Sequence, residues 1–197
     1  MDRFRYCVAL LVVMVGPTIL VYWLAIHRWI RLWRRLGAAA TLGAVWSLML
    51  VSAAGLFRAR GWLLSVDFGT HRFLAIAGLI CLGIAGWLGW ELRRNFGFRV
   101  LLGLPELAPS RYPARLIAEG VHARVRHPRY VQLFVALAGW SLLANYAASY
   151  AVCALWIPGV WVMARLEERE LRERFGPAYE EYCRRVPAFV PRRPDRS

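Results

Sequence analysis

The sequence predicts an all-α polytopic membrane protein with about five transmembrane helices, the last two forming a helical hairpin, and a cytoplasmic C-terminal cap. Hydrophobic residues make up 59% of the 197 residues, against about half in a typical soluble domain. Three stretches, 6–26, 36–57 and 73–90, contain no charged residue, and a helix needs about 20 apolar residues to cross the bilayer core. A soluble fold of this size would have to bury several helices that are apolar on every side. We therefore expect residues 1–197 to form a single integral membrane domain.

The first two predicted spans, 6–26 and 36–57, are joined by residues 27–35, which carry four Arg and two Trp. Basic loops with aromatic anchors are typical of the cytoplasmic side of a membrane. The next connection, 58–72, has three Arg together with an Asp and a His. It is less basic than the first loop and is therefore predicted to lie outside.

The third predicted span, 73–90, contains glycines that recur on one side of a helix. Gly83, Gly86 and Gly89 are spaced three residues apart, and Gly78 lies about one turn earlier. Small residues at helical spacing let another backbone approach closely. Close helix packing is the favoured interpretation, and a groove left open for a ligand is the alternative.

A long uncharged segment follows a basic loop. Residues 91–130 carry eight Arg against three Glu and are predicted to be cytoplasmic. The 34 residues of 131–164 contain no charge. A single helix of that length would measure about 51 Å, well above the roughly 30 Å of the bilayer core. The sequence therefore predicts two shorter legs, 128–145 and 147–164, that turn at residues 145–146.

The tail, 165–197, is predicted to lie against the cytoplasmic face without crossing the membrane. Gly176-Pro177 ends one helix and opens the next. The following helix is amphipathic, with apolar residues at i, i+3, i+4 and i+7: Tyr179, Tyr182, Cys183 and Val186. The most basic loops and this tail then fall on one side. We expect the N-terminus outside and the C-terminus in the cytoplasm, in the inner membrane of a bacterium.

Charge and cysteine usage argue against two other classes of partner. The formal net charge is +14, and all 26 basic residues are Arg. They lie between apolar spans, which fits membrane orientation and anionic headgroups better than nucleic acid, and no groove-reading motif is present. The four cysteines are scattered and form no CxxC motif. Neither nucleic-acid binding nor a bound metal is expected.

The residues that could bind a ligand or react lie at the two ends of the predicted hairpin. His127-Pro128 opens the first leg, where Pro fits the first helical turn and His127 lies beside backbone N–H groups that attract anions. Glu167-Glu168 follow the last apolar leg, at the electronegative end of its helix, which indicates that a cation binds there. A hairpin would bring both ends to one surface of the membrane.

Two simpler interpretations stay open. Residues 126–130 are also typical of a headgroup anchor, and Arg165 and Arg169 could neutralise the two glutamates. One cofactor matches both ends of the hairpin. S-adenosylmethionine carries a sulfonium and an ammonium for the carboxylates, and a carboxylate for the arginines and the helix N-terminus.

Three motifs carry a family resemblance: Leu116-Ile117-x-x-Gly120, Arg126-His127-Pro128-x-Tyr130 and Glu167-Glu168-x-x-Leu171-x-x-x-Phe175-Gly176-x-x-Tyr179-x-x-Tyr182-x-x-x-Val186-Pro187. They resemble the C-terminal half of isoprenylcysteine carboxyl methyltransferases and, more loosely, phospholipid N-methyltransferases of the same membrane superfamily. The resemblance covers roughly residues 116–191. It implies a small multi-span enzyme that takes S-adenosylmethionine from the cytoplasm and its acceptor from the bilayer, with 91–191 as the cofactor-binding half.

The resemblance also implies roles for individual residues. Arg165 is the candidate catalytic residue, which would steer an acceptor carboxylate. His122 stands where the family usually has Tyr. The residues expected to bind the cofactor are Leu116, Ile117, His122, His127, Pro128, Arg129, Tyr130, Glu167 and Glu168.

Together these observations predict a membrane methyltransferase that uses S-adenosylmethionine and acts on a lipophilic acceptor, with carboxylate O-methylation favoured. An ionised carboxylate needs no general base, whereas a thiol or an amine would need one, and His127 or His122 could serve. Positioning and desolvation should dominate the transfer. Two alternatives remain. One is an NADPH-dependent sterol-type membrane reductase, which shares an RHP-like motif, and the other is a non-catalytic membrane protein on the same scaffold.

Overall fold

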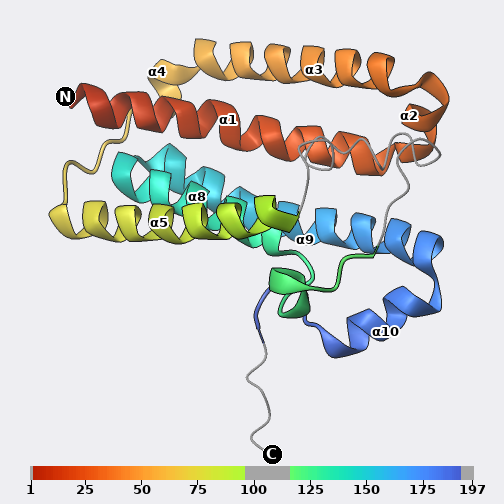
Figure 1. The fold of residues 1–197 in the computed structure, drawn as a ribbon. Helices are drawn as coiled ribbons and strands as arrows, with labels where there is room; N and C mark the ends of the chain where they lie inside the picture. The colour runs from red at the N-terminus through yellow and green to blue at the C-terminus, as the bar shows by residue number, and fades with distance from the viewer. Residues whose placement is uncertain (1, 96–115, 192–197) are drawn as a thin grey trace, which may run out of the picture.

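The computed structural model describes residues 2–95 and 116–191, and this part of the chain is helical, as predicted (Figure 1). Its β-structure is limited to one isolated bridge between Asp67 and Tyr146. The helices are α1 (Arg3–Arg28), α2 (Ile30–Leu36), α3 (Ala38–Arg58), α4 (Arg60–Leu63), α5 (Arg72–Asn95), η1 (Gly120–Ala123), α8 (Pro128–Ala144), α9 (Ala147–Phe175) and α10 (Pro177–Arg185).

Four helices of the described chain are long and apolar enough to cross a membrane: Arg3–Ile26, Ala39–Arg58, Arg72–Arg94 and Ala147–Phe175. They contain the predicted spans 6–26, 73–90 and 147–164. The predicted span 36–57 starts too early, because α2 ends at Leu36 and α3 begins only at Ala38. The remaining predicted span, 128–145, forms α8 almost residue for residue. With 17 residues, α8 is shorter than the other four helices, so a fifth crossing stays a prediction.

α1 occupies the middle of the bundle. It packs against α3 on one side and against α8 and α9 on the other, while α5 covers α8 (Figure 1). The indole N–H of Trp156 on α9 donates to the backbone oxygen of Gly16 on α1 at 2.9 Å. Leu20 packs so closely on Gly159 that a Cβ there would lie 2.5 Å from the leucine. These contacts build the main apolar core between α1, α8 and α9.

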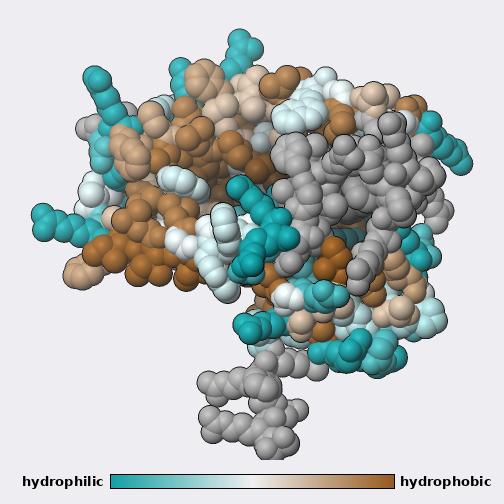
Figure 2. Space-filling view, viewed as in Figure 1, coloured by the Kyte–Doolittle hydropathy of each residue, from teal (hydrophilic) through white to brown (hydrophobic). Residues whose placement is uncertain are grey.

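Much of the remaining helix surface is apolar and exposed. Figure 2 shows hydrophobic side chains spread over the outward faces of the long helices. In α3 and in α5, only 11% of the most apolar 18-residue stretch is buried within the protein. Such faces suit a bilayer, where lipid tails replace the contacts that a soluble protein would need.

The glycines of α5 divide into two groups. At Gly78 a Cβ would lie 2.8 Å from the backbone oxygen of Gly139 on α8, and at Gly139 a Cβ would lie 2.9 Å from the oxygen of Gly78. This pair lets the two backbones touch, in agreement with the packing interpretation. At Gly83 and Gly86 a Cβ would have no other atom within 4 Å, so these two glycines face open space and take no part in the contact with α8.

The turn between α8 and α9 lies where the sequence predicts it. Asn145 has φ 55° and ψ 48°, the left-handed conformation that Asn tolerates at a helix C-terminus. Its side-chain nitrogen donates to the backbone oxygen of Gly69 at 2.8 Å, and its side-chain oxygen accepts from the Tyr150 hydroxyl at 2.8 Å. The hairpin turn is thereby attached to the connection between α4 and α5.

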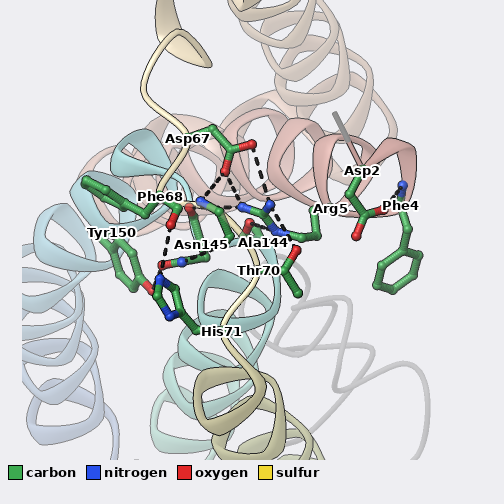
Figure 3. Close-up of polar contacts among 11 residues, drawn as sticks. Asp2, Phe4, Arg5, Asp67, Phe68, Thr70, His71, Ala144, Asn145 and Tyr150 are labelled. Atoms are coloured by element: carbon green, nitrogen blue, oxygen red, sulfur yellow. Dashed lines mark hydrogen bonds and ion pairs between the residues drawn. The ribbon is translucent and has the colours of Figure 1, made fainter.

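A buried arginine completes this attachment (Figure 3). Arg5, near the start of α1, forms an ion pair with Asp67. Its Nε donates to the backbone oxygen of Ala144 at 3.1 Å, and its Nη1 donates to the Thr70 hydroxyl at 3.3 Å. We call Arg5, Asp67, Thr70 and Asn145 the hairpin clamp. It joins three segments at the end of the bundle opposite to the start of α8.

One expectation about α9 is wrong. Glu167 and Glu168 do not stand at the C-terminal end of their helix, because α9 continues to Phe175. Charged residues end an apolar span but not a helix, and the Glu, Arg and Leu that follow are strong helix formers. The helix stops at Gly176, with φ 53°, and α10 begins at Pro177 as predicted.

Candidate functional site

The predicted motif 126–130 opens α8. His127 is its N-cap residue and Pro128 its first residue, as the sequence predicts. Proline is accommodated there because its missing N–H would have no partner within the helix. The backbone N–H of Tyr130 donates to the His127 oxygen at 3.1 Å and closes the first turn. His127 is buried, with 4% of its surface exposed.

The hairpin brings both predicted ends together. His127 Nδ1 lies 3.3 Å from Glu167 Oε2, and His127 Nε2 lies 3.2 Å from Glu168 Oε1. These residues are forty and forty-one positions apart in the chain. We call His127, Glu167 and Glu168 the histidine–glutamate cluster. The convergence expected from a folded-back hairpin is therefore observed.

The two glutamates have different surroundings. Glu168 is buried, and its Oε1 accepts from Arg126 Nε at 3.0 Å and from Arg126 Nη2 at 2.6 Å. Its Oε2 accepts from Arg172 at 3.2 Å. The protein itself thus compensates the Glu168 charge. The Glu167 side chain is more open, with 29% of its surface exposed against 11% for Glu168.

Arg126 also holds the end of the chain in place. Its guanidinium donates to the backbone oxygens of Cys183 and Val186, and its backbone N–H donates to Pro187. The His127 N–H donates to Ala188 at 3.0 Å. The segment after α10 therefore runs along the start of α8. Arg126 was not among the predicted site residues, although it belongs to the recognised motif.

His127 lies between two aromatic rings. Tyr130 stacks on it with ring centroids 5.6 Å apart and an interplanar angle of 19°, and Phe189 lies 5.5 Å away at 36°. Burial alone would lower the pKa of His127, but hydrogen bonds and charge from the two glutamates outweigh it and raise the pKa to about 9. The imidazole is therefore protonated at neutral pH, and it is a poor general base in this arrangement.

His122 has the opposite character. It lies in η1, half-buried, and its backbone oxygen accepts from the Tyr182 hydroxyl at 2.7 Å. Burial lowers its pKa to about 4, even though the charge of Glu167 acts to raise it. His122 is neutral at pH 7 and lies within electrostatic range of both Glu167 and His127.

A buried tyrosine hydroxyl lies near the same carboxylates. Tyr179, on α10, is 1% exposed, and its hydroxyl has no hydrogen-bond partner within the described chain. Burial raises its pKa, and the charge of Glu168 raises it further. Buried hydroxyls normally have a partner, which makes this group a candidate contact for a ligand.

The other predicted residues lie around the cluster or away from it. Leu116 packs against the apolar side of α10. Ile117 is half-buried, and Pro128 is buried at the start of α8. Arg129 is half-buried, and Arg93 on α5 is a close electrostatic neighbour. Arg165 is exposed on α9, with its guanidinium 4.5 Å from the centre of the Trp161 ring.

An apolar groove adjoins the cluster. It has a volume of about 340 Å³ and lies between α8, α9 and the segment after α10. We call it the α8–α9 groove. Tyr130, which stacks on His127, forms one of its walls, and Trp161, on which Arg165 lies, forms another. The full lining is Tyr130, Val131, Phe134, Ile157, Val160, Trp161, Phe189 and Val190.

Sequence reasoning missed Phe189 and Trp161. No motif marks Phe189. It reaches His127 only because the segment after α10 runs back along the start of α8. Trp161 lies four residues before Arg165, and this spacing places both side chains on one face of a helix. That spacing was the available signal.

The phospholipid methyltransferase family matches residues 68–178. The chain belongs to this family. The matched region runs from the connection before α5 into α10 and includes the histidine–glutamate cluster. Together with the four long apolar helices, membership of the phospholipid methyltransferase family supports a membrane methyltransferase.

Curated relatives match in shorter segments. The protein-S-isoprenylcysteine O-methyltransferase of Schizosaccharomyces pombe is 34% identical over 77 residues, 39% of this chain and 33% of that protein. The nickel-cobalt-cadmium resistance protein NccN of Alcaligenes xylosoxydans xylosoxydans is 32% identical over 83 residues, 42% of this chain and 39% of that protein. The cobalt-zinc-cadmium resistance protein CzcN of Cupriavidus metallidurans is 36% identical over 78 residues, 39% of this chain and 36% of that protein.

The matches thus span between a third and two-fifths of the relatives' own length. No solved structure matches the chain. Two of these relatives are named for metal resistance. Within the described residues, no group of three or more His, Cys, Asp or Glu is placed to hold a metal ion, so we draw no metal-binding function from those names.

Proposed function

We propose that the chain transfers a methyl group from S-adenosylmethionine to a lipophilic acceptor in the bilayer, with a carboxylate as the favoured acceptor group. One observation carries this proposal. Tyr130 belongs both to the wall of the apolar α8–α9 groove and to the stack on His127. A charged cluster and a lipid-accessible groove therefore share a side chain, as transfer from a polar cofactor to a lipophilic acceptor requires.

The residues present fit the cofactor at two points. Glu167 retains an exposed carboxylate surface that can accept hydrogen bonds from an ammonium group. The Tyr179 hydroxyl is buried without a partner in the described chain and can bind a polar ligand atom. S-adenosylmethionine would supply an activated methyl group on its sulfonium. Within the predicted set we propose Glu167 as the direct contact, with His122, Leu116 and Ile117 contributing from the preceding segment.

His127 and Glu168 are better suited to positioning than to direct contact. Both nitrogens of His127 are engaged by the glutamates, and Glu168 is held by Arg126. The His127 imidazolium fixes the orientation of Glu167, and Pro128 fixes the start of α8. Tyr130 closes the cluster toward the groove and excludes water from it. Arg129 lies toward α5, and we leave it out of this pocket.

The acceptor side is built from the α8–α9 groove. Its apolar lining can hold a hydrocarbon chain that enters from the bilayer. Arg165 lies on Trp161 at this groove and can attract an acceptor carboxylate. An ionised carboxylate needs no deprotonation. For a thiol or an amine, His122 is the histidine that is unprotonated at pH 7, but its pKa of about 4 makes it a weak base, and His127 is already protonated.

The test is methyl transfer in a membrane. Purified protein in lipid nanodiscs is incubated with S-adenosylmethionine carrying a radiolabelled methyl group and with lipid extracts as acceptors. We expect incorporation by the wild type, and a loss of about tenfold or more in Glu167→Gln, because one charge-assisted hydrogen bond to the cofactor is removed. Glu173→Gln is the matched control, since Glu173 is an exposed glutamate of the same helix that pairs with Arg169.

Two results would overturn the proposal. One is the absence of incorporation from every extract together with no calorimetric binding of S-adenosylmethionine, which would favour a non-catalytic scaffold. The other is tight binding of NADPH in place of S-adenosylmethionine, which would favour the reductase. The family match favours methyl transfer over reduction.

A further inference from the structure

Arg93 on α5 and Arg129 on α8 are electrostatic neighbours at one end of this helix pair. α5 and α8 run antiparallel, since Gly78 lies against Gly139 and Gly89 lies against Gln132, where a Cβ would be 3.5 Å from the Gln132 nitrogen. Arg93 follows Gly89 by about one helical turn, and Arg129 precedes Gln132 by about one turn. Both arginines therefore lie at the same end of the helix pair, next to the start of α8.

The pair carries concentrated positive charge. The two guanidinium groups are close enough to repel each other. In the described ranges, no acidic side chain forms an ion pair with either of them, whereas the neighbouring Arg94 lies 3.8 Å from Glu91. Like charges at close range cost free energy unless an anion lies between them. The arrangement therefore suits an anion that both arginines can bind.

The surface beside the pair is apolar and exposed. Ile84, Trp87 and Trp90 of α5 are 47%, 57% and 65% exposed, and they lead along the helix toward Arg93. Figure 2 shows hydrophilic side chains gathered near the end of α5, beside the hydrophobic outer face of that helix. Tryptophans followed by arginines are typical of the boundary between lipid tails and headgroups. An anion bound here would lie beside an apolar surface. A phospholipid can cover that surface with its acyl chains, whereas a small soluble anion cannot.

We propose that Arg93 and Arg129 bind the phosphate of an anionic phospholipid headgroup, with the acyl chains of this lipid lying along the exposed face of α5. Guanidinium groups bind phosphate through paired hydrogen bonds. Basic pockets between membrane helices are suited to anionic headgroups. The site is separate from the proposed methyl-transfer pocket, and its occupancy is measurable without any enzymatic activity.

The test uses the full chain in mild detergent. Thermal unfolding is followed while phosphatidylglycerol or phosphatidylcholine with the same acyl chains is added. A ligand that binds the folded state raises the midpoint temperature with its concentration. We expect phosphatidylglycerol to raise it at lower concentrations than phosphatidylcholine. The variant R93Q/R129Q should bind phosphatidylglycerol weaker by tenfold or more, on the order expected for two interfacial arginines.

The matched control is Arg94→Gln, which removes the same charge one residue further along α5, from an arginine that pairs with Glu91. It should bind phosphatidylglycerol within about twofold of the wild type, because diffuse surface charge contributes little. Arg93→Gln alone serves if the double variant fails to fold, since Arg93 is exposed. An equal loss in Arg94→Gln would overturn the proposal. So would equal stabilisation by both lipids, or the same stabilisation by inorganic phosphate alone.

Discussion

At the scale of single residues, His127 is a group whose pKa is raised by the carboxylates that the hairpin brings to it. Its imidazole is buried between Tyr130 and Phe189 and bound on both nitrogens by carboxylates. A histidine in that position is an internal counter-ion. In the structure the motif therefore contacts both carboxylates through His127.

This position makes stability depend on pH. The folded pKa of His127 is about 9, above its ordinary 6.5. The stabilisation from its charge is therefore fully present below pH 6.5 and is lost as the pH rises through 9. Each pKa unit corresponds to about 1.4 kcal/mol, so the upper limit of the effect is about 3 kcal/mol. Chemical unfolding in detergent between pH 6 and 10 should show the stability difference between wild type and His127→Gln shrinking as the pH rises. A difference that is independent of pH would contradict this assignment.

The sequence predicted which residues come together in this site better than it predicted how their charges are compensated. The spacing of the motifs and the uncharged hairpin were enough to place His127 beside Glu167 and Glu168. They were not enough to show that Arg126 neutralises Glu168, because such a pairing depends on side-chain directions that a linear pattern does not contain. The contact of Phe189 with His127 could not be predicted for the same reason.

At the scale of helices, α5 and α8 pack closely because two glycines, Gly78 and Gly139, face each other where the helices cross. A Cβ at Gly78 would meet the Gly139 backbone oxygen at 2.8 Å, and a backbone oxygen cannot move aside as the end of a flexible side chain can. This crossing sets the distance between the helix that bears Arg93 and the helix that begins at Pro128.

Gly78→Ala should therefore lower the free energy of unfolding by about 1–3 kcal/mol, the usual cost of overpacking. Gly83→Ala is the matched control on the same helix, because no atom of another element lies within 4 Å of a Cβ there. Its effect should be neutral or stabilising by up to about 1 kcal/mol, since Ala is the better helix former. Thermal unfolding of both variants in the same detergent measures the difference. Equal effects at the two positions would show that the crossing is looser than described.

Helix existence was predictable, and helix ends were less so. The turn at Asn145 follows from the length of the uncharged segment, which exceeds one bilayer crossing. Hydropathy ends the last predicted span at residue 164, eleven residues before the end of α9, because it reports where a helix leaves lipid and gives no information about where its hydrogen bonding stops. Gly176 was the better signal for that boundary.

At the scale of the whole molecule, polar groups hold the bundle at both ends. The histidine–glutamate cluster and Arg126 join α8, α9 and the chain end, and the hairpin clamp joins α1, the connection before α5 and the hairpin turn. Between them the contacts are mostly apolar. Hydropathy predicted these apolar spans, but it does not report which helix packs against which. The central position of α1 could therefore not be derived from the sequence.

The clamp predicts a large effect far from the site. Arg5→Met removes the guanidinium that pairs with Asp67 and donates to the buried Ala144 oxygen. Asp67 is exposed and can be hydrated, whereas a buried acceptor left without its donor costs about 1–3 kcal/mol. Arg3→Met is the matched control, because Arg3 is exposed on the same helix, and it should change stability by no more than about 0.5 kcal/mol. Unfolding in detergent, followed by tryptophan fluorescence, compares the two variants. Similar losses in both would mean that the clamp contributes nothing specific.

The contact between Trp156 and Gly16 also bears on how the protein is made. α1 is synthesised and inserted before every other helix described, and α9 is the last of the long apolar helices to leave the ribosome. The core between them can close only when α9 has arrived, and the same helix carries Glu167 and Glu168. A partly synthesised chain therefore holds α1 in the membrane without its main partners, exposed to lipid or to insertion factors. The site and the core therefore become complete together, once α9 has been synthesised.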